Sequence, residues 1–228
     1  MQVMAIIPAR GQSKRIPHKN IIDLNGTPLI GYTITAALKS KYIQRVIVTT
    51  DDERIAEISK TYGAEVQYPR PTELSGDHDN LENVLKYMVK SYAVDFNADV
   101  LVLLQPTSPF RKTLHVDQAI ELFINSGADT VTAVQKVSEH PYFMWKIYDG
   151  QLMPFYSLED QKSSRHQLPQ FFIENGSIYI VKKETLLKDG IYGKKVIPFE
   201  MNHFDSVDID EPIDVEWAKF LLNYSPKK

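Results

Sequence analysis

The chain of 228 residues contains no cysteine. This absence excludes disulfide bonds, a thiol nucleophile and a metal site with cysteine ligands, and it agrees with a reducing compartment. No apolar run approaches the roughly 20 residues of a membrane-spanning helix, and no basic leader precedes the short apolar run at the N-terminus. We therefore expect a soluble, cytoplasmic protein.

The chain also lacks a large excess of charge of either sign. It has 26 Lys and Arg against 29 Asp and Glu, a formal net charge of −3, so nothing global attracts it to nucleic acid or to an anionic membrane. The 6 histidines show no close helical metal-binding spacing, and no Gly-x-Ser-x-Gly elbow is present. Zinc and acyl-transfer chemistry are therefore weak options, and any anionic ligand must be met by local basic groups.

Apolar runs of strand length alternate with helical patterns in the first half of the chain. Strands are predicted at 3–7, 46–50 and 100–104, and helices at 29–38, 54–62 and 81–92. This alternation predicts an α/β fold, with a mostly parallel sheet flanked by helices. Because the carboxyl ends of parallel strands meet at one edge of a sheet, the polar loops that follow these strands should share one rim.

The pattern changes after a predicted strand at 130–134. The segment 138–172 is rich in proline, aromatic residues and methionine and has no helical periodicity, which predicts an extended excursion from a single domain spanning 1–228. Further strands are predicted at 176–181 and 195–199. A last helix should begin after Asp210-Glu211-Pro212, with one apolar side formed by Ile213, Trp217, Phe220 and Leu221.

Basic side chains gather in the loop that follows the first predicted strand. Arg10, Lys14 and Lys19 supply positive charge, Ser13 supplies a hydroxyl donor, and small residues let backbone N–H groups approach phosphate oxygens. Triphosphate is the natural partner of such a loop. Its spacing matches neither a Walker P-loop nor a dinucleotide fingerprint, and the alternative is a solvated basic loop.

A rigid polar segment, Gln105-Pro106-Thr107-Ser108-Pro109, follows a buried strand. Its prolines restrict the backbone of the residues before them, so the Gln105 amide can be held preorganised at the rim. The alternative is a turn that only ends the strand.

Two carboxylates lie in Asp205-Ser206-Val207-Asp208-Ile209-Asp210. Alternation along an extended segment places Asp208 and Asp210 on one face. Two carboxylates suit Mg²⁺, which binds through one or two protein carboxylates together with substrate phosphates and water. The alternative for Asp210 is a role as the N-cap of the last helix.

Three further residues are weaker candidates. Arg165 offers a fork for a sugar carboxylate, and Phe171 offers an apolar surface for an acyl group, although a core role for Phe171 is the commoner outcome. Arg70, between two prolines, either binds an anion or occupies a turn.

Taken in order, these segments resemble the acylneuraminate cytidylyltransferase family, the CMP-sialic acid synthetases. The resemblance extends over essentially the whole chain and rests on five blocks, Ile7-Pro8-Ala9-Arg10-Gly11-Gln12-Ser13-Lys14-Arg15-Ile16-Pro17-His18-Lys19-Asn20, Leu104-Gln105-Pro106-Thr107-Ser108-Pro109-Phe110-Arg111, Gln167-Leu168-Pro169-Gln170, Asn175-Gly176-Ser177-Ile178-Tyr179 and Asp205-Ser206-Val207-Asp208-Ile209-Asp210.

The resemblance implies a Rossmann-like nucleotidyltransferase fold that takes CTP and a free nonulosonic acid, a nine-carbon acidic sugar, and releases pyrophosphate. It implies Mg²⁺ at Asp208 and Asp210, with Asp210 also a candidate proton acceptor. The other implied roles are triphosphate binding by Arg10, Lys14, Lys19 and Asn20, nucleotide binding by Arg70, and sugar binding by Gln105, Arg165 and Tyr179. The excursion would form a homodimer interface that reaches into the neighbouring subunit's pocket.

Departures from the family pattern concern the sugar more than the reaction. Gln12 and Arg15 stand where the loop usually has small residues, and Ile173-Glu174 replace a common Arg-Pro. A legionaminic or pseudaminic acid is therefore as good a candidate as a sialic acid. The alternatives are a CMP-Kdo synthetase or other sugar nucleotidyltransferase, a glycosyltransferase that uses the two aspartates for its metal, and a nucleotide-binding module without catalysis.

Overall fold

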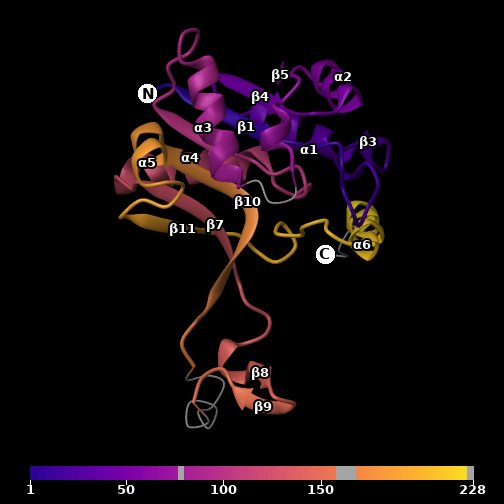
Figure 1. Ribbon diagram of the computed structural model, residues 1–228, viewed down its shortest axis with the longest axis vertical. Helices are drawn as coiled ribbons and strands as arrows, with labels where there is room; N and C mark the ends of the chain where they lie inside the picture. The colour runs from indigo at the N-terminus through magenta and orange to yellow at the C-terminus, as the bar shows by residue number, and fades with distance from the viewer. Residues whose placement is uncertain (77–79, 158–167, 225–228) are drawn as a thin grey trace.

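The protein is built around a twisted seven-stranded sheet (Figure 1), in a computed structural model that describes residues 1–76, 80–157 and 168–224. The strand order is β11-β7-β10-β6-β1-β4-β5. The bounds are β1 (Val3–Pro8), β4 (Arg45–Thr49), β5 (Glu65–Gln67), β6 (Val100–Leu103), β7 (Thr130–Lys136), β10 (Phe172–Lys182) and β11 (Val196–Glu200). Among the strands of this sheet that the structure describes, β10 alone runs antiparallel to its neighbours. The predicted α/β class with a mostly parallel sheet is confirmed.

Helices cover both faces of the sheet. The helices α1 (Leu29–Leu38), α2 (Glu53–Thr61) and α4 (Thr113–Ser126) pack on one face, and α3 (Leu81–Tyr92) and α5 (Lys183–Lys188) pack on the other. Side chains of a strand alternate between the two faces of the sheet. In β1, Ala5 and Ile7 therefore pack against α1, α2 and α4, and Met4 and Ile6 pack on the opposite face with α3. Burying one such isoleucine stabilises the fold by about 1.5–3 kcal/mol.

Two helices begin at side-chain caps that also fix the loops at the carboxyl edge of the sheet. The Asp52 carboxylate accepts hydrogen bonds from the backbone N–H groups of Arg54 and Ile55, at 2.9 and 3.2 Å, and so starts α2. Asn80 accepts one from the N–H of Glu82, at 2.9 Å, and starts α3. Such caps are each worth about 1 kcal/mol.

Between β7 and β10 the chain leaves the sheet and forms an extension, which we call the arm (137–171, with 158–167 outside the described residues). It contains the short helix η3 (Pro141–Phe143) and the antiparallel hairpin β8 (Trp145–Tyr148) and β9 (Gln151–Pro154). Figure 1 shows the hairpin at the far end of the arm, well below the sheet. The chain returns from that end into the sheet, which is why β10 runs opposite to the strands beside it.

The last helix, α6 (Pro212–Asn223), packs on the small hairpin of β2 (Asp23–Leu24) and β3 (Thr27–Pro28). Its buried residues are Val215 and Ala218. The expected apolar side is different: Ile213, Trp217 and Phe220 are 72%, 44% and 51% exposed. Helical spacing indicated an apolar face, but the helix turns a different and narrower face toward the core.

The N-cap alternative for Asp210 is wrong. Glu211 occupies the N-cap position of α6, where its N–H donates to the Asp214 carboxylate at 2.7 Å. The Asp210 carboxylate is therefore available for other contacts. Within the described residues, no helix combines the length and the apolar character that crossing a membrane requires.

Candidate functional site

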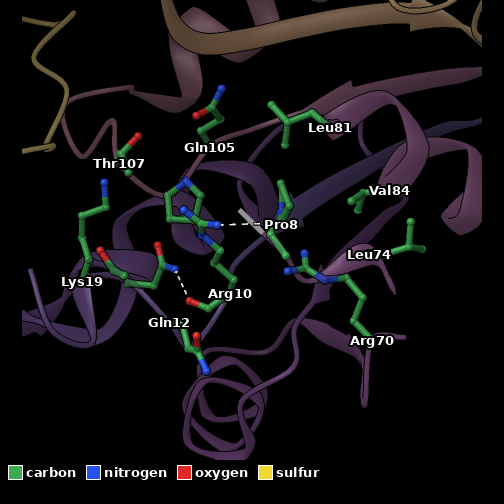
Figure 2. Close-up of a pocket in the computed structure, with 14 residues that line it drawn as sticks. Pro8, Arg10, Gln12, Lys19, Arg70, Leu74, Leu81, Val84, Gln105 and Thr107 are labelled. Atoms are coloured by element: carbon green, nitrogen blue, oxygen red, sulfur yellow. Dashed lines mark hydrogen bonds between the residues drawn. The ribbon is translucent and has the colours of Figure 1, made fainter. Parts of the chain in front are cut away.

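A pocket of about 280 Å³ opens at the carboxyl edge of the sheet (Figure 2). It lies among the loops that follow β1, β5 and β6, together with the start of α3, so the predicted common rim forms. Six of the candidate residues line it: Arg10, Ser13, Lys19, Asn20, Arg70 and Gln105. The rest of the lining comprises Pro8, Gln12, Leu74, Gly76, Leu81, Val84, Pro106 and Thr107, of which only Leu74, Gly76, Leu81 and Val84 lie outside the segments that the sequence marked as candidate binding loops.

The loop after β1 is held by neighbours in the fold. The buried Asn20 side chain donates to the Arg10 carbonyl at 2.9 Å, and the N–H of Gly11 donates to the Asp51 carboxylate at 2.8 Å. A Cβ at Gly11 would lie 2.6 Å from the Cβ of Asp52, so only glycine fits against the start of α2. The loop is thus preorganised, with one of its N–H groups already engaged.

Two arginines and several apolar side chains line the pocket. Figure 2 shows Arg10 and Arg70 reaching into it from different loops. Arg70 is only 5% exposed, and its Nε donates to the Ser75 hydroxyl at 3.2 Å. Leu81 and Val84 form part of the apolar lining. Apolar side chains beside cationic groups suit a ligand with an aromatic base and several negative charges.

Lys19 joins the pocket to the two aspartates. Its ammonium group donates to the Asp210 carboxylate and to the Ile209 carbonyl, each at 2.8 Å. Ile209 is fully buried, and its N–H donates to the Thr107 carbonyl at 2.9 Å. This hydrogen bond attaches the segment 205–210 to the loop after β6. With Ile209 buried, Asp208 and Asp210 are exposed on the other face of the segment, as the alternation predicted.

The surroundings of Asp208 disfavour its charge. Its carboxylate accepts a hydrogen bond from the Thr107 hydroxyl, yet partial burial raises the pKa of Asp208, and the negative charge of Asp210 raises it further. Within the described part of the chain, no group of three or more His, Asp or Glu is placed to hold a metal ion. Two neighbouring carboxylates beside a basic pocket nevertheless fit Mg²⁺, because this ion completes its shell with phosphate oxygens and water.

The buried Arg111 side chain supports the loop after β6, a role that the sequence did not suggest. It is 2% exposed, and its Nη1 donates to the carbonyls of Gln105 and Ser177 at 3.1 and 2.6 Å. Nη2 donates to the Thr33 hydroxyl. Burial lowers the pKa of Arg111 to about 9, and the charge of Asp208 opposes that change.

Besides Asp208 and Asp210, three predicted residues that the structure describes do not line the pocket. Tyr179 is 9% exposed on β10, where it pairs with Leu103 of β6. Phe171 packs at the base of the arm, with ring centroids 5.0 Å from His140 and 5.7 Å from Tyr142. Lys14 lies in the β1 loop on the side of Pro17 and His18, and Arg165 falls outside the described residues.

Comparisons with known proteins agree with this geometry. The family model described as cytidylyltransferase matches residues 4–221. A CMP-N,N'-diacetyllegionaminic acid synthase of Legionella pneumophila is 36% identical over 222 residues, covering 96% of this chain and 94% of the relative. An N-acylneuraminate cytidylyltransferase of Escherichia coli is 33% identical over 95% of this chain, which spans only 51% of that relative.

Among solved structures, a CMP:2-keto-3-deoxy-manno-octonic acid synthetase complexed with CTP superimposes with a TM-score of 0.73. It is 18% identical, and the match covers 98% of this chain and 99% of that one. At this identity the likeness concerns the fold, and it confirms the expected Rossmann-like nucleotidyltransferase architecture.

Proposed function

Because the chain belongs to the cytidylyltransferase family, we propose that it joins CTP to a free nonulosonic acid and releases pyrophosphate and the CMP-sugar. One observation carries this proposal: Lys19 connects a basic pocket, which it lines, to a pair of outward-facing carboxylates. Such an arrangement suits a metal-bound triphosphate. The Legionella relative acts on a legionaminic acid and the Escherichia relative on an acylneuraminate, by their names, and both substrates are nonulosonic acids.

In this proposal the nucleotide fills the pocket from the apolar wall to the two aspartates. The cytosine lies against Leu81 and Val84, near Arg70, and the triphosphate extends along Arg10 and Lys19. Ser13 and Asn20 line the same path. Fixed side-chain donors here stabilise phosphate charge without having to reorganise during the reaction.

The reaction that we propose is an in-line displacement. The anomeric hydroxyl of the sugar passes its proton to Asp210 and its oxygen attacks the α-phosphate, the bond to the β-phosphate breaks, and pyrophosphate leaves with the electron pair of that bond. Asp208 and Asp210 would hold Mg²⁺, and a bound magnesium ion supplies neutralisation of phosphate charge. Arg10 and Lys19 stabilise the charge that develops on the transferring and departing phosphates, and with Asp210 they form the proposed catalytic set. Gln105 and Tyr179 belong to the sugar side.

The proposal is tested by incubating the purified protein with CTP, Mg²⁺ and one acid at a time from neuraminic, legionaminic, pseudaminic and Kdo types, and measuring pyrophosphate. We expect release with at least one nine-carbon acid and none without the acid. Release with Kdo alone would favour the CMP-Kdo synthetase alternative. Silence across the panel would contradict the synthetase proposal and favour a glycosyltransferase or a module that only binds the nucleotide.

We also propose that the protein is a homodimer, assembled through the arm and working in the cytoplasm. The arm exposes an unusual amount of apolar surface, and monomeric proteins rarely leave such patches uncovered. Its exposed large side chains are Phe143, Met144, Trp145, Ile147, Tyr148, Leu152, Met153, Phe155 and Tyr156. A closed two-fold dimer would cover this surface on both copies.

Charge placed on the arm should therefore separate the two copies. Ile147 and Leu152 are directly paired across the β8–β9 hairpin and are 77% and 65% exposed. We expect the double variant Ile147→Asp/Leu152→Asp to sediment as a monomer where the unmodified protein sediments as a dimer. Ile213→Asp, at an equally exposed apolar position on α6, is the matched control and should leave the dimer intact. A monomeric unmodified protein would overturn the dimer proposal.

A further inference from the structure

A carboxylate and a tyrosine of β10, Glu174 and Tyr179, meet Tyr192 from the loop after α5 on the proposed sugar side. Oε2 of Glu174 accepts hydrogen bonds from the Tyr192 hydroxyl at 2.7 Å and from the Tyr179 hydroxyl at 3.3 Å. Tyr179 lies in the core layer, and Tyr192 is 49% exposed. One carboxylate oxygen is thus fixed from two directions, from a buried side and from an exposed side.

The segment that carries Glu174 runs beside Gln105. Gly176 has φ +71°, and a Cβ on it would lie 3.5 Å from Nε2 of Gln105, which lines the pocket. The buried Asn175 locks this turn, since its Oδ1 accepts from the N–H of Ser177 at 3.0 Å and its Nδ2 donates to Ser206 at 2.9 Å. The turn that directly follows Glu174 is therefore held against Gln105, the residue that the proposed function assigns to the sugar side.

Tyr192 is tied to the pocket rim from the other side. It follows a turn in which the N–H of Ile191 donates to the Glu82 carboxylate at 3.4 Å. Glu82 comes directly after Leu81, which lines the pocket. The Glu174 group is therefore linked to the nucleotide pocket through two separate elements, the loop after β6 and the start of α3.

Both tyrosines act as donors, and Glu174 acts as an acceptor. Burial, followed by the Glu174 charge, raises the pKa of Tyr179 to about 12, and burial, followed by the hydrogen bond to Glu174, raises the pKa of Tyr192. Both phenols thus keep their protons at neutral pH. Among the described residues no donor reaches Oε1 of Glu174, so one carboxylate oxygen is left to accept from a ligand.

We propose that Glu174 is a specificity-determining residue of the sugar site, and that it accepts a hydrogen bond from an O–H or N–H group of the acidic sugar at a position remote from the sugar's own carboxylate. This inference rests on the proposed function. A sugar with a donor at that position replaces the hydrogen bond to water that Glu174 loses on binding. A sugar that places a methyl group or a second anion there leaves the carboxylate unpaired or repelled, which binding sites discriminate against strongly.

The test compares Glu174→Gln with the unmodified protein on pairs of nonulosonic acids that differ at one substituent, hydroxyl against deoxy or amine against methyl. We expect KM for the donor-bearing acid to rise about ten- to hundredfold, and the preference within one pair to collapse. The kcat and the KM for CTP should stay within about twofold, because the change removes binding contacts on the sugar side. Glu184→Gln, on α5 at the opposite edge of the sheet, is the matched control and should change nothing.

A second variant separates recognition from folding. Tyr192→Phe removes the shorter of the two hydrogen bonds to Glu174 and should raise the sugar KM about three- to tenfold with kcat retained. If Glu174→Gln does not fold, this variant alone decides the inference. An active protein whose variants keep the original sugar KM and preference would overturn the inference alone. An unmodified protein that releases no pyrophosphate with any acid would overturn the proposed function and this inference together.

Discussion

Asp208→Asn is expected to lower kcat by about three orders of magnitude, equivalent to roughly 4 kcal/mol of transition-state stabilisation. The substitution keeps the shape of the side chain and an oxygen that can still accept the hydrogen bond from the Thr107 hydroxyl. It removes only the negative charge. If Asp208 and Asp210 hold Mg²⁺ against the triphosphate, losing one of two carboxylates removes most of that binding.

The same variant should fold normally. The pKa of Asp208 is raised on folding, mainly by burial, and a carboxyl whose pKa is raised destabilises the folded protein as pH rises through that value. Removing the charge at neutral pH should therefore leave the melting temperature unchanged or slightly higher. Thermal melting and pyrophosphate release at saturating CTP and sugar are the two measurements.

Asp95→Asn is the matched control for this loss of charge. Asp95 is exposed in the loop before β6, at the edge of the sheet opposite the pocket, and the change should leave kcat unaltered. Turnover within about threefold of the unmodified protein for Asp208→Asn would show that the metal assignment is wrong, because that corresponds to less than 1 kcal/mol.

The common rim of the site could be predicted because it depends on one rule of parallel sheets. The loops after β1 and β6 had to emerge at the same edge, and the sequence already placed Arg10 and Gln105 in them. The contribution of α3 was not predicted. Leu81 and Val84 belong to an ordinary amphipathic helix, and nothing local marks two apolar residues as part of a ligand site.

The direction of β10 was also beyond local prediction. An apolar run such as Ile178–Val181 indicates a strand but not its orientation, which here follows from the return of the chain along the arm. The antiparallel entry brings Glu174 and Tyr179 to the same edge as Gln105. Glu174 departs from the family pattern, but only the fold shows that the hydroxyls of Tyr179 and Tyr192 donate to its carboxylate.

Capping shows a similar limit. Asp210 before Glu211-Pro212 looked like an N-cap because aspartate is a strong cap, whereas the structure places Glu211 there. A shift of one residue changes the chemistry completely, since it leaves the Asp210 carboxylate to Lys19. Helix boundaries read from sequence are rarely accurate to one residue.

Arg111→Met is expected to reduce the free energy of unfolding by about 2–5 kcal/mol. Methionine fills much of the space but leaves the carbonyls of Gln105 and Ser177 without the donor that they have at 3.1 and 2.6 Å. A buried carbonyl that loses its donor costs about 1–3 kcal/mol. The melting temperature should fall by about 5–15 °C, and kcat should fall as well because Gln105 loses its anchor.

Burial, rather than charge, decides the size of this effect, and a second arginine provides the comparison. Arg15 forms an ion pair with Glu211 at 3.2 Å, but its side chain is 61% exposed. Arg15→Met should therefore change stability by no more than about 1 kcal/mol. Arg111→Lys should fall between the two, because lysine keeps a charge but lacks the planar fork that serves several acceptors at once. Equal melting temperatures for Arg111→Met and Arg15→Met would mean that water replaces the guanidinium beneath Gln105, and that Arg111 does not hold the loop in place.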